Sequence, residues 1–416
     1  MQRSINYKLS MMMFLQFFIW GSWFVTLGTF MANNLAATGG QIGMAFSTQS
    51  WGAIIAPFII GLIADRYFNA ERILGLLHLS GALLMYQLYG ADDFGDFYPL
   101  LLLYMILYMP TLALVNAVAF HQMKDAAQEF SAIRVWGTIG WIVAGVMISY
   151  LFSWDSQQAL VDGQLKHTFL MAAIASAILG ALSFSLPKTE PANHQGGSGG
   201  LKSLLGLDAL SLLKDKNFLM FFLSSILICI PLAFYYQNAS PFLTEVGMEN
   251  STAKMTLGQV SEVLFMLCVP IFLQRFGIKI TLLIAMLAWA LRYVLFAFGD
   301  AGSPALMLLL GIALHGACYD FFFVAGQIYT DSKAGRTYRS AAQGMVTLAT
   351  YGMGMLIGLA VAGKVTDTYV SDFGHDWQSI WLIPAAFSLI VLVVFALFFK
   401  REKMTVAESS TTIAAS

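Results

Sequence analysis

Four charged side chains lie inside long apolar stretches of the sequence: Arg134, Glu262, Arg292 and Asp320. A charge at the centre of a bilayer costs about 2.5–3.5 kcal/mol on insertion scales, so such residues usually mark a ligand site or an ion path. A carboxyl group there can hold a proton when it is dry and release it when water reaches it. The alternative is structural ion pairing between helices. These four positions are where polar chemistry is expected.

The first candidate face belongs to the segment that begins near Arg134. Arg134, Thr138 and Trp141 are at positions i, i+4 and i+7, so they share one face of a helix. They offer a guanidinium fork, a hydroxyl and an aromatic plate, while Gly137 and Gly140 permit a neighbouring helix to pack closely. The alternative is that Arg134 simply extends toward the nearer membrane surface.

Two further faces carry the acids. Gln259 and Glu262 are at i and i+3, and an acid beside an amide suits sugar hydroxyls, which both donate and accept hydrogen bonds. His315 and Tyr319 are at i and i+4, and Asp320 flanks them, which favours a planar, hydrogen-bonding ligand. No second histidine lies near His315, so we expect no metal ion there.

Two residue groups have more than one interpretation. Arg292 is expected to be a structural counter-ion for one of the acids, and direct contact with the ligand is the alternative. Pro231 is followed by the stretch Tyr235 to Asn238, which indicates either a broken helix end lining a cavity or an aromatic belt at the membrane interface. On the first interpretation, Tyr236 and Gln237 join the candidate substrate-binding residues.

The amino-acid composition indicates what kind of secondary structure carries these candidate residues. The chain has 416 residues, of which 58% are hydrophobic and 11% charged, and its mean hydropathy is +0.71. Ordinary soluble domains are about 25% charged, and a net charge of −1 offers no basic field for nucleic acid. Cys229, Cys268 and Cys318 lie in apolar runs and predict neither a disulfide nor a metal site. The sequence predicts an all-α membrane protein.

Apolar runs separated by charged or turn-rich breaks predict twelve transmembrane helices in two six-helix bundles. The first run follows Lys8 and is longer than a signal-peptide core, so we expect it to remain uncleaved. The expected spans are 9–32, 42–64, 72–90, 98–121, 132–153, 167–186, 217–243, 255–274, 279–299, 304–330, 340–364 and 377–399.

The distribution of charge predicts the topology. Most of the 22 Lys and Arg residues fall in the loops on the side of the N-terminus, which places both termini in the cytoplasm. A Gly- and Ser-rich stretch near the middle of the chain predicts a flexible tether. We therefore expect an N-terminal bundle at 1–186, a cytoplasmic linker at 187–216, a C-terminal bundle at 217–403 and a disordered cytoplasmic tail at 404–416.

A short motif repeats at matching places in the two halves. Gly61, Asp65, Arg66 and Arg72 lie at the junction of the second and third expected spans, and Gln274-Arg275 to Lys279 lies at the junction of the eighth and ninth. The first resembles the loop motif of the major facilitator superfamily, in which Asp65, Arg66 and Arg72 would be charges that hold one conformation. The alternative is that these arginines only set topology. Matching junctions are typical of transporters built by duplication.

Over nearly its whole length the sequence resembles the nucleoside:proton symporter family of that superfamily. The resemblance is carried, in order, by the stretches Phe14–Trp23, Tyr108–Thr111, Arg134–Gly140, Leu204–Ala209, Gln259–Glu262, Trp289–Arg292 and Tyr319–Phe322. It implies proton-driven nucleoside uptake across the inner (plasma) membrane by a multi-pass protein, with no enzymatic activity and no cofactor. The implied partners are a nucleoside, protons and lipid, with no nucleic acid, and the protein is expected to be a monomer.

The resemblance also assigns roles to residues. It implies that the nucleoside contacts Arg134, Thr138, Trp141, Gln259, Glu262, Tyr319 and Asp320. The sequence departs from bacterial permeases of the family at His315, where they have Tyr, and at Trp141 and Tyr319, where they have Phe. Ala233 and Tyr236 stand where they carry a polar pair. Nucleobase preference stays open, and so does the alternative of a major-facilitator transporter for another polar sugar-like or aromatic solute.

The expected proton carrier is Asp320, with Glu262 as the second choice. Both are carboxylic acids inside spans, and the aromatic neighbours of Asp320 make its surroundings drier. From a different class, a membrane enzyme or sensor is disfavoured. The sequence shows no nucleophile–base pair, phosphate-binding loop or metal-ligand cluster.

Overall fold

The computed structural model describes residues 2–59, 69–123, 126–189, 207–302, 305–372 and 374–402. Asp65 and Arg66 lie outside the described residues, as do most of the expected linker and the expected tail. The predictions for those segments stay predictions.

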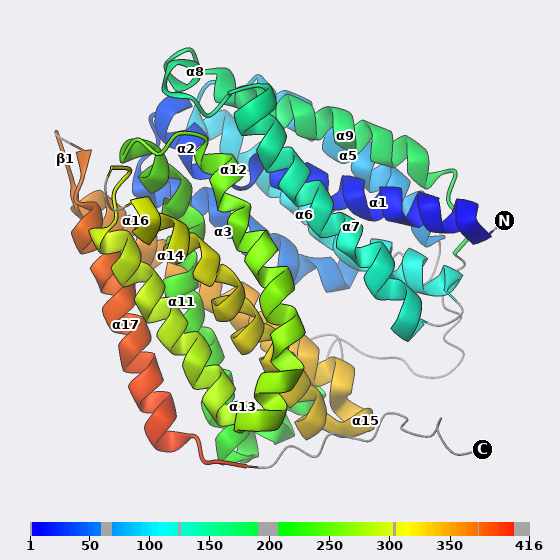
Figure 1. The fold of residues 1–416 in the computed structure, drawn as a ribbon. Helices are drawn as coiled ribbons and strands as arrows, with labels where there is room; N and C mark the ends of the chain where they lie inside the picture. The colour runs from blue at the N-terminus through cyan, green and yellow to red at the C-terminus, as the bar shows by residue number, and fades with distance from the viewer. Residues whose placement is uncertain are drawn as a thin grey trace.

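The described residues of the first half are mostly helical (Figure 1). Apolar segments of this length are stable in lipid as helices, because a helix satisfies its backbone hydrogen bonds internally. Asp93 begins one of them, since its carboxylate accepts a hydrogen bond from the amide of Asp96 at 2.9 Å. The elements are α1 (Gln2–Trp23), α2 (Leu27–Asn34), α3 (Gly39–Ile59), α5 (Ala70–Tyr89), α6 (Phe94–Gln122), α7 (Ala126–Val146), the π-helical η2 (Met147–Leu151), α8 (Gln157–Val161), η3 (Gln164–Lys166) and α9 (His167–Ser183).

The second half is also helical, apart from one small antiparallel hairpin in which Val370 pairs with His375. Asp215 begins its first long helix, because its carboxylate accepts from the amides of Asn217 and Phe218. The elements are η4 (Leu207–Lys214), α11 (Lys216–Glu245), α12 (Ser251–Met255), α13 (Leu257–Phe298), α14 (Ala305–Tyr319), the π-helical η5 (Asp320–Val324), α15 (Ala325–Thr347), the π-helical η6 (Leu348–Gly354), α16 (Met355–Thr368), β1 (Val370–Ser371), β2 (Gly374–His375) and α17 (Trp377–Phe398).

Two expected loops fall inside continuous helical assignments. Within α13, Gly277 has φ 73° and ψ 170°, a backbone state that favours glycine and that turns the chain between two helices. Within α15, the amide of Gln343 donates to the carbonyl of Gln327 at 2.8 Å. A straight helix would separate these residues by about 24 Å, so α15 folds back on itself. Both turns lie where the sequence predicts breaks between spans.

Nine helices in the described part of the chain are long and apolar enough to cross a membrane. They lie at Ser4–Asn34, Phe94–Gln122, Ala132–Leu151, Gln164–Ser183, Lys216–Glu245, Ser251–Phe298, Ala305–Ala334, Ala341–Thr368 and Trp377–Phe398. The predicted class of all-α membrane protein is therefore confirmed.

The helices form two groups that belong to the two halves of the sequence. In the first, α1 packs against α7 and α9, and α5 packs against α6; in the second, α13 packs against α14 and α17. The groups meet near α2, α8 and α12 (Figure 1). Small residues permit the closest approaches: a Cβ added at Gly140 would overlap the carbonyl of Phe14, and one added at Gly316 would lie 2.5 Å from the carbonyl of Ser261.

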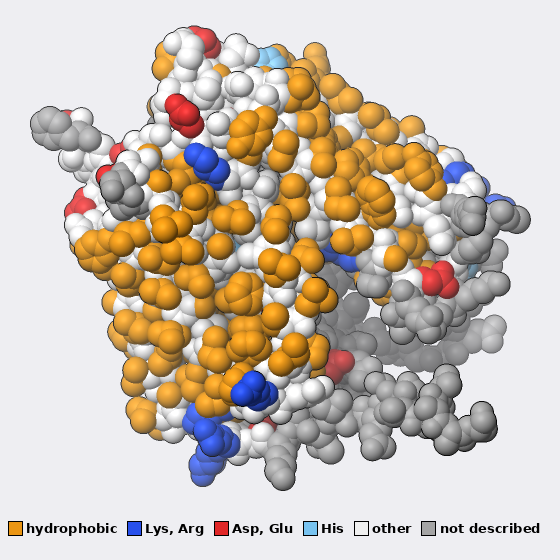
Figure 2. All heavy atoms as spheres, viewed as in Figure 1, with side chains coloured by type: hydrophobic (Ala, Val, Ile, Leu, Met, Phe, Trp, Pro, Cys, Tyr) orange, Lys and Arg blue, Asp and Glu red, His pale blue; other side chains and the backbone are white. Residues whose placement is uncertain are grey.

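The outer surface of the second half is strongly apolar. Figure 2 shows hydrophobic side chains covering the outward faces of α13 and α17. Leu267 of α13 and Leu397 of α17 are 71% and 73% exposed. Exposed apolar surface on this scale marks contact with a membrane or a partner, and here it agrees with the membrane-spanning helices.

Candidate functional site

Glu262 lies close enough to several predicted site residues for their charges to interact. Its charge interacts with Arg134 of α7, across the boundary between the two halves. It also interacts with Tyr236 of α11, with Tyr319 of α14 and with Asp320. The structure thus brings together residues from four helices and both halves, which the sequence could only place on separate faces.

Aromatic rings form the first-half side of this site. Trp141 lies 5.7 Å from Trp20, ring centre to ring centre, and Trp20 lies 5.7 Å from Tyr108. Phe24 is 5.8 Å from Tyr236, so the aromatic cluster continues into the second half. Edge-to-face pairs of this kind hold rings in fixed orientations. The cluster can therefore present a stiff apolar surface to a planar ligand.

Arg134 and Thr138 occupy the polar part of the same wall. The guanidinium carbon of Arg134 lies 4.1 Å from the ring centre of Phe17, a cation–π contact that fixes the side chain in place. Thr138 is half-buried one turn further along α7. Gly137 and Gly140 pack against α1, since a Cβ at Gly137 would meet Phe17 at 2.6 Å and one at Gly140 would overlap Phe14. The predicted use of these glycines for close packing is confirmed.

Tyr319 forms the second-half side of the site. Its ring lies 5.8 Å from that of His315 and 5.0 Å from that of Phe323. Its hydroxyl forms a hydrogen bond with the hydroxyl of Tyr351 in η6. The π-helical η5 begins at the next residue, Asp320, and π-helical turns are frequent at functional sites.

Asp320 is fully buried. Neither of its carboxylate oxygens has a hydrogen-bond partner among the described residues. Burying an ionised carboxylate without a partner is costly, because nothing replaces the water that it loses. Asp320 is therefore a buried acid with free acceptor capacity, next to the residues that surround Glu262.

The structure corrects the expected partner of Arg292. Its guanidinium is fully buried, lies 3.4 Å from the ring centre of Tyr235 and donates to Nδ1 of His315 at 3.1 Å. Within the described ranges no acid lies at ion-pair distance from it, so the interpretation as a counter-ion of Glu262 or Asp320 is wrong there. His315, 5% exposed, is bound to Arg292 and stacks on Tyr235 and Tyr319, and its predicted contact with the substrate stays a prediction.

The structure also places three other residues that the sequence singled out. Gln237 is fully buried, and its amide donates to the carbonyl of Gly39 at 3.0 Å, so it lies in the contact between the halves. Gln259 is half-buried on α13, one turn before Glu262. Arg72 is exposed near the start of α5. Gln259 thus stays with the site, whereas Gln237 does not, and the role of Arg72 as a charge of the loop motif stays a prediction.

The two halves are joined at one end of the molecule. Thr29 and Ser240 share a hydrogen bond of 2.7 Å, and Asp155 accepts from the amide of Thr252 at 3.1 Å. Seven hydrogen bonds between described residues of the two halves lie at this end, around α2, the start of α3, η2, α8, α12 and the end of α16. This end is closed, with the Glu262 cluster further along the helices.

Four residues of the site were not predicted from the sequence: Trp20, Phe24, Tyr108 and Tyr351. Trp20 and Tyr108 lie inside stretches that carry the family resemblance, and that signal could have pointed to them. Their contacts with Trp141 depend on how α1, α6 and α7 are rotated against one another. Spacing within one helix does not contain that information.

A polar and aromatic cluster between two helical halves, closed at one end, defines a membrane transporter. A solved crystal structure of a mutant of the nucleoside transporter NupG has the same fold: the TM-score is 0.88 at 31% identity, over 95% of this chain and all of that one. This chain accordingly has the major facilitator fold.

The chain belongs to the nucleoside H+ symporter family, whose sequence model matches residues 3–404. It is 43% identical to YegT of Escherichia coli strain K12, over 95% of this chain and 94% of that one. It is 35% identical to the xanthosine permease of the same organism, over 95% and 96% of the two chains. The predicted family, transport class and multi-pass inner-membrane location are confirmed, and the chain is a transporter rather than an enzyme.

Proposed function

We propose that this protein imports nucleosides together with protons by alternating access of a central site. The observation that carries the proposal is the cluster around Glu262 in a chain of this family, because it joins Arg134 of one half to Tyr319 and Asp320 of the other. A ligand that contacts both halves stabilises the states in which the halves have closed on it.

We propose twelve spans with both termini in the cytoplasm. Dividing α13 at Gly277 and adding α3 and α5 to the nine candidate helices gives this number. The bias of Lys and Arg toward one side supports the orientation. The end at which the halves are joined then faces the outside, and this conformation opens toward the cytoplasm.

Ribose is proposed to bind at Glu262 and Gln259. A carboxylate accepts two hydrogen bonds from vicinal hydroxyls, and the neighbouring amide both donates and accepts. The nucleobase is proposed to lie against Trp141, Trp20 and Tyr319, with Arg134, Thr138 and Tyr236 as polar contacts. Aromatic surfaces tolerate purines and pyrimidines alike.

The proton is proposed to bind at Asp320, with Glu262 as the second candidate. Asp320 is the fully buried acid of the two and has no protein hydrogen-bond partner among the described residues. A carboxyl group that is neutral in the closed states and ionises when water enters can link proton movement to rocking of the halves. We propose that a single chain suffices, because both halves of the site come from one polypeptide.

A competition uptake assay tests the substrate class. Cells expressing the protein take up labelled uridine in the presence of excess adenosine, inosine, xanthosine or free ribose. The proposal expects nucleosides to compete and ribose alone to compete poorly, since the base contributes stacking area. Failure of every nucleoside would instead favour another polar sugar-like or aromatic solute.

A further inference from the structure

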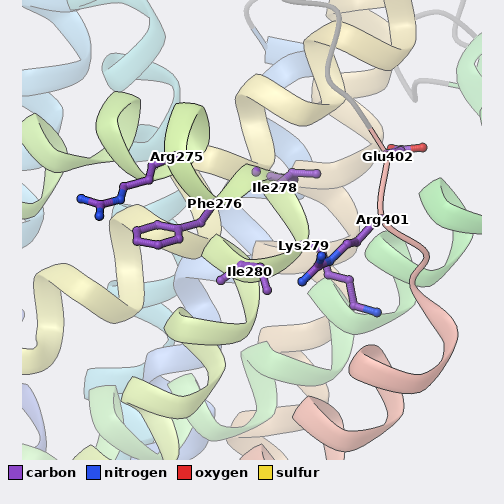
Figure 3. A pocket seen from close by; sticks show the side chains of 8 residues that line it. Arg275, Phe276, Ile278, Lys279, Ile280, Arg401 and Glu402 are labelled. Carbon is purple, nitrogen blue, oxygen red and sulfur yellow. The ribbon is translucent and has the colours of Figure 1, made fainter.

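A cavity of about 500 Å³ lies where α13 reverses direction, far from the Glu262 cluster. It is formed by the turn at Gly277 together with the residues that follow α17 (Figure 3). Three of its lining residues are cationic, Arg275, Lys279 and Arg401, and one is acidic, Glu402. Nothing in the transport mechanism uses this cavity.

The cavity lining has three cations and one acid, so its net charge is positive. The carboxylate of Glu402 already pairs with Lys333 at 2.9 Å and accepts from Asn217 at 3.0 Å. Within the described segments, no acid lies at ion-pair distance from Arg275, Lys279 or Arg401. Cations that line the same cavity repel one another, so binding of an anion among them is favoured.

Lys279 and Arg401 are the two cations best placed to share an anion. Figure 3 shows their side chains in the same part of the cavity, whereas Arg275 extends away beyond Phe276. Lys279 donates one hydrogen bond, to the carbonyl of Ala396 at 2.7 Å, which positions its ammonium and leaves two donors free. The Arg401 guanidinium offers a planar fork, which suits two oxygens of one phosphate.

The apolar surroundings of the cavity identify the kind of anion. Phe276 is 44% exposed and Ile271, further back on α13, is 59% exposed; Leu397 and Phe398 of α17 are 73% and 65% exposed. Hydrophobic side chains cover the outer faces of both helices down to the Lys and Arg residues at the lower edge of Figure 2. A soluble anion gains nothing from this surface, whereas the acyl chains of a lipid would lie along it.

We propose that this cavity binds the phosphate of an anionic phospholipid of the cytoplasmic leaflet, through Lys279 and Arg401, with acyl chains along α13 and α17. Basic pockets between membrane helices on the cytoplasmic side are suited to anionic headgroups. The bound lipid would tie the turn of α13 to the end of α17. The proposal uses the proposed topology and is independent of the substrate.

Native mass spectrometry of the full-length detergent-solubilised protein tests the proposal, by titration with phosphatidylglycerol and, separately, with phosphatidylcholine. Wild-type protein should bind phosphatidylglycerol with clear preference. A Lys279→Gln, Arg401→Gln double variant should bind it roughly tenfold or more weakly, because each cation near a membrane surface contributes about fivefold. Arg401→Gln alone, at an exposed position, should lose about fivefold.

The matched control is Lys214→Gln, Lys216→Gln, which removes two exposed charges at the start of the same half. It should keep the wild-type preference. Equal loss in both double variants would mean that overall charge attracts the lipid, and equal binding of the two lipids by wild type would mean that no headgroup site exists. Displacement of phosphatidylglycerol by glycerol phosphate at equal concentration would assign the cavity to a soluble anion. Any of these three results overturns the proposal.

Discussion

The carboxylate of Asp367 in α16 accepts a hydrogen bond from the amide of Gly40 in α3 at 2.8 Å, although the two residues belong to different halves of the chain. The other oxygen of Asp367 accepts from the amide of Gly39. These amides open α3, and the partial positive charge of a helix N-terminus stabilises an anion there. Asp367 is therefore a latch that holds the two halves together at the closed end.

Removal of this charge should favour opening of the latched end. Asp367→Asn loses the anion and one acceptor, and charge-assisted hydrogen bonds contribute about 1.5–3 kcal/mol. We expect a shift of about tenfold toward the opened state. The measurement uses a chain whose three native cysteines are replaced and that carries spin labels at Asp92→Cys and Glu249→Cys. Double electron–electron resonance then reports the distance between the two labels, one in each half.

The control for the latch is Asp372→Asn, which removes an exposed acid from the hairpin after α16. It should leave the distance distribution unchanged. An unaltered distribution in Asp367→Asn as well would show that the latch does not set the conformational equilibrium.

Glu262→Gln should weaken ribonucleosides more than 2′,3′-dideoxynucleosides. Losing a charged hydrogen-bond partner costs about 1.5–3 kcal/mol, roughly tenfold or more in affinity, and only a substrate with ribose hydroxyls has that partner to lose. Apparent affinities from competition uptake measure the difference, with the exposed Glu249→Gln as the matched control. Equal losses for both sugars would remove Glu262 from the ribose site.

Trp141→Ala should raise the apparent KM for every nucleoside tested. Its ring belongs to the cluster with Trp20 and Phe24, so its loss removes stacking surface whatever the base. Trp136→Ala is the control, because Trp136 lies on the same helix and is 43% exposed. Protein levels in the membrane should stay constant in both variants, and normal kinetics in Trp141→Ala would assign that ring to packing alone.

Gly140→Ala should destabilise the first half. The new methyl group would overlap the carbonyl of Phe14, and relieving the overlap means moving α1 away from α7. Overpacking of this kind costs about 1–3 kcal/mol. The Tm in detergent should fall, whereas Gly344→Ala, where the added Cβ meets nothing within 4 Å, should leave it unchanged. Equal Tm values for the two variants would contradict the close contact of α1 with α7.

The sequence predicted the helices well because hydropathy and length decide which segments enter a membrane. It also placed Arg134, Glu262 and Tyr319 on the helix faces predicted to bind the ligand, since spacing within a helix determines which residues share a face. The contacts between helices were not predictable in this way. Gln237 turns toward α3, and Arg292 turns to His315 and Tyr235. Which partner each side chain contacts depends on the rotation and depth of its helix. The spacing of residues within a single helix does not contain that information.

Accumulation of nucleoside in proteoliposomes under an imposed inward proton gradient tests the central claim most directly. The account predicts that wild-type protein concentrates labelled uridine above the external level and that a protonophore abolishes this. Asp320→Asn is expected to lose gradient-driven accumulation while keeping uridine counterflow, because the proposed contacts at Glu262, Gln259 and Trp141 remain and the buried acid is gone. Wild-type accumulation that is insensitive to the protonophore would contradict proton coupling, and undiminished, protonophore-sensitive accumulation by Asp320→Asn would contradict the assignment of Asp320.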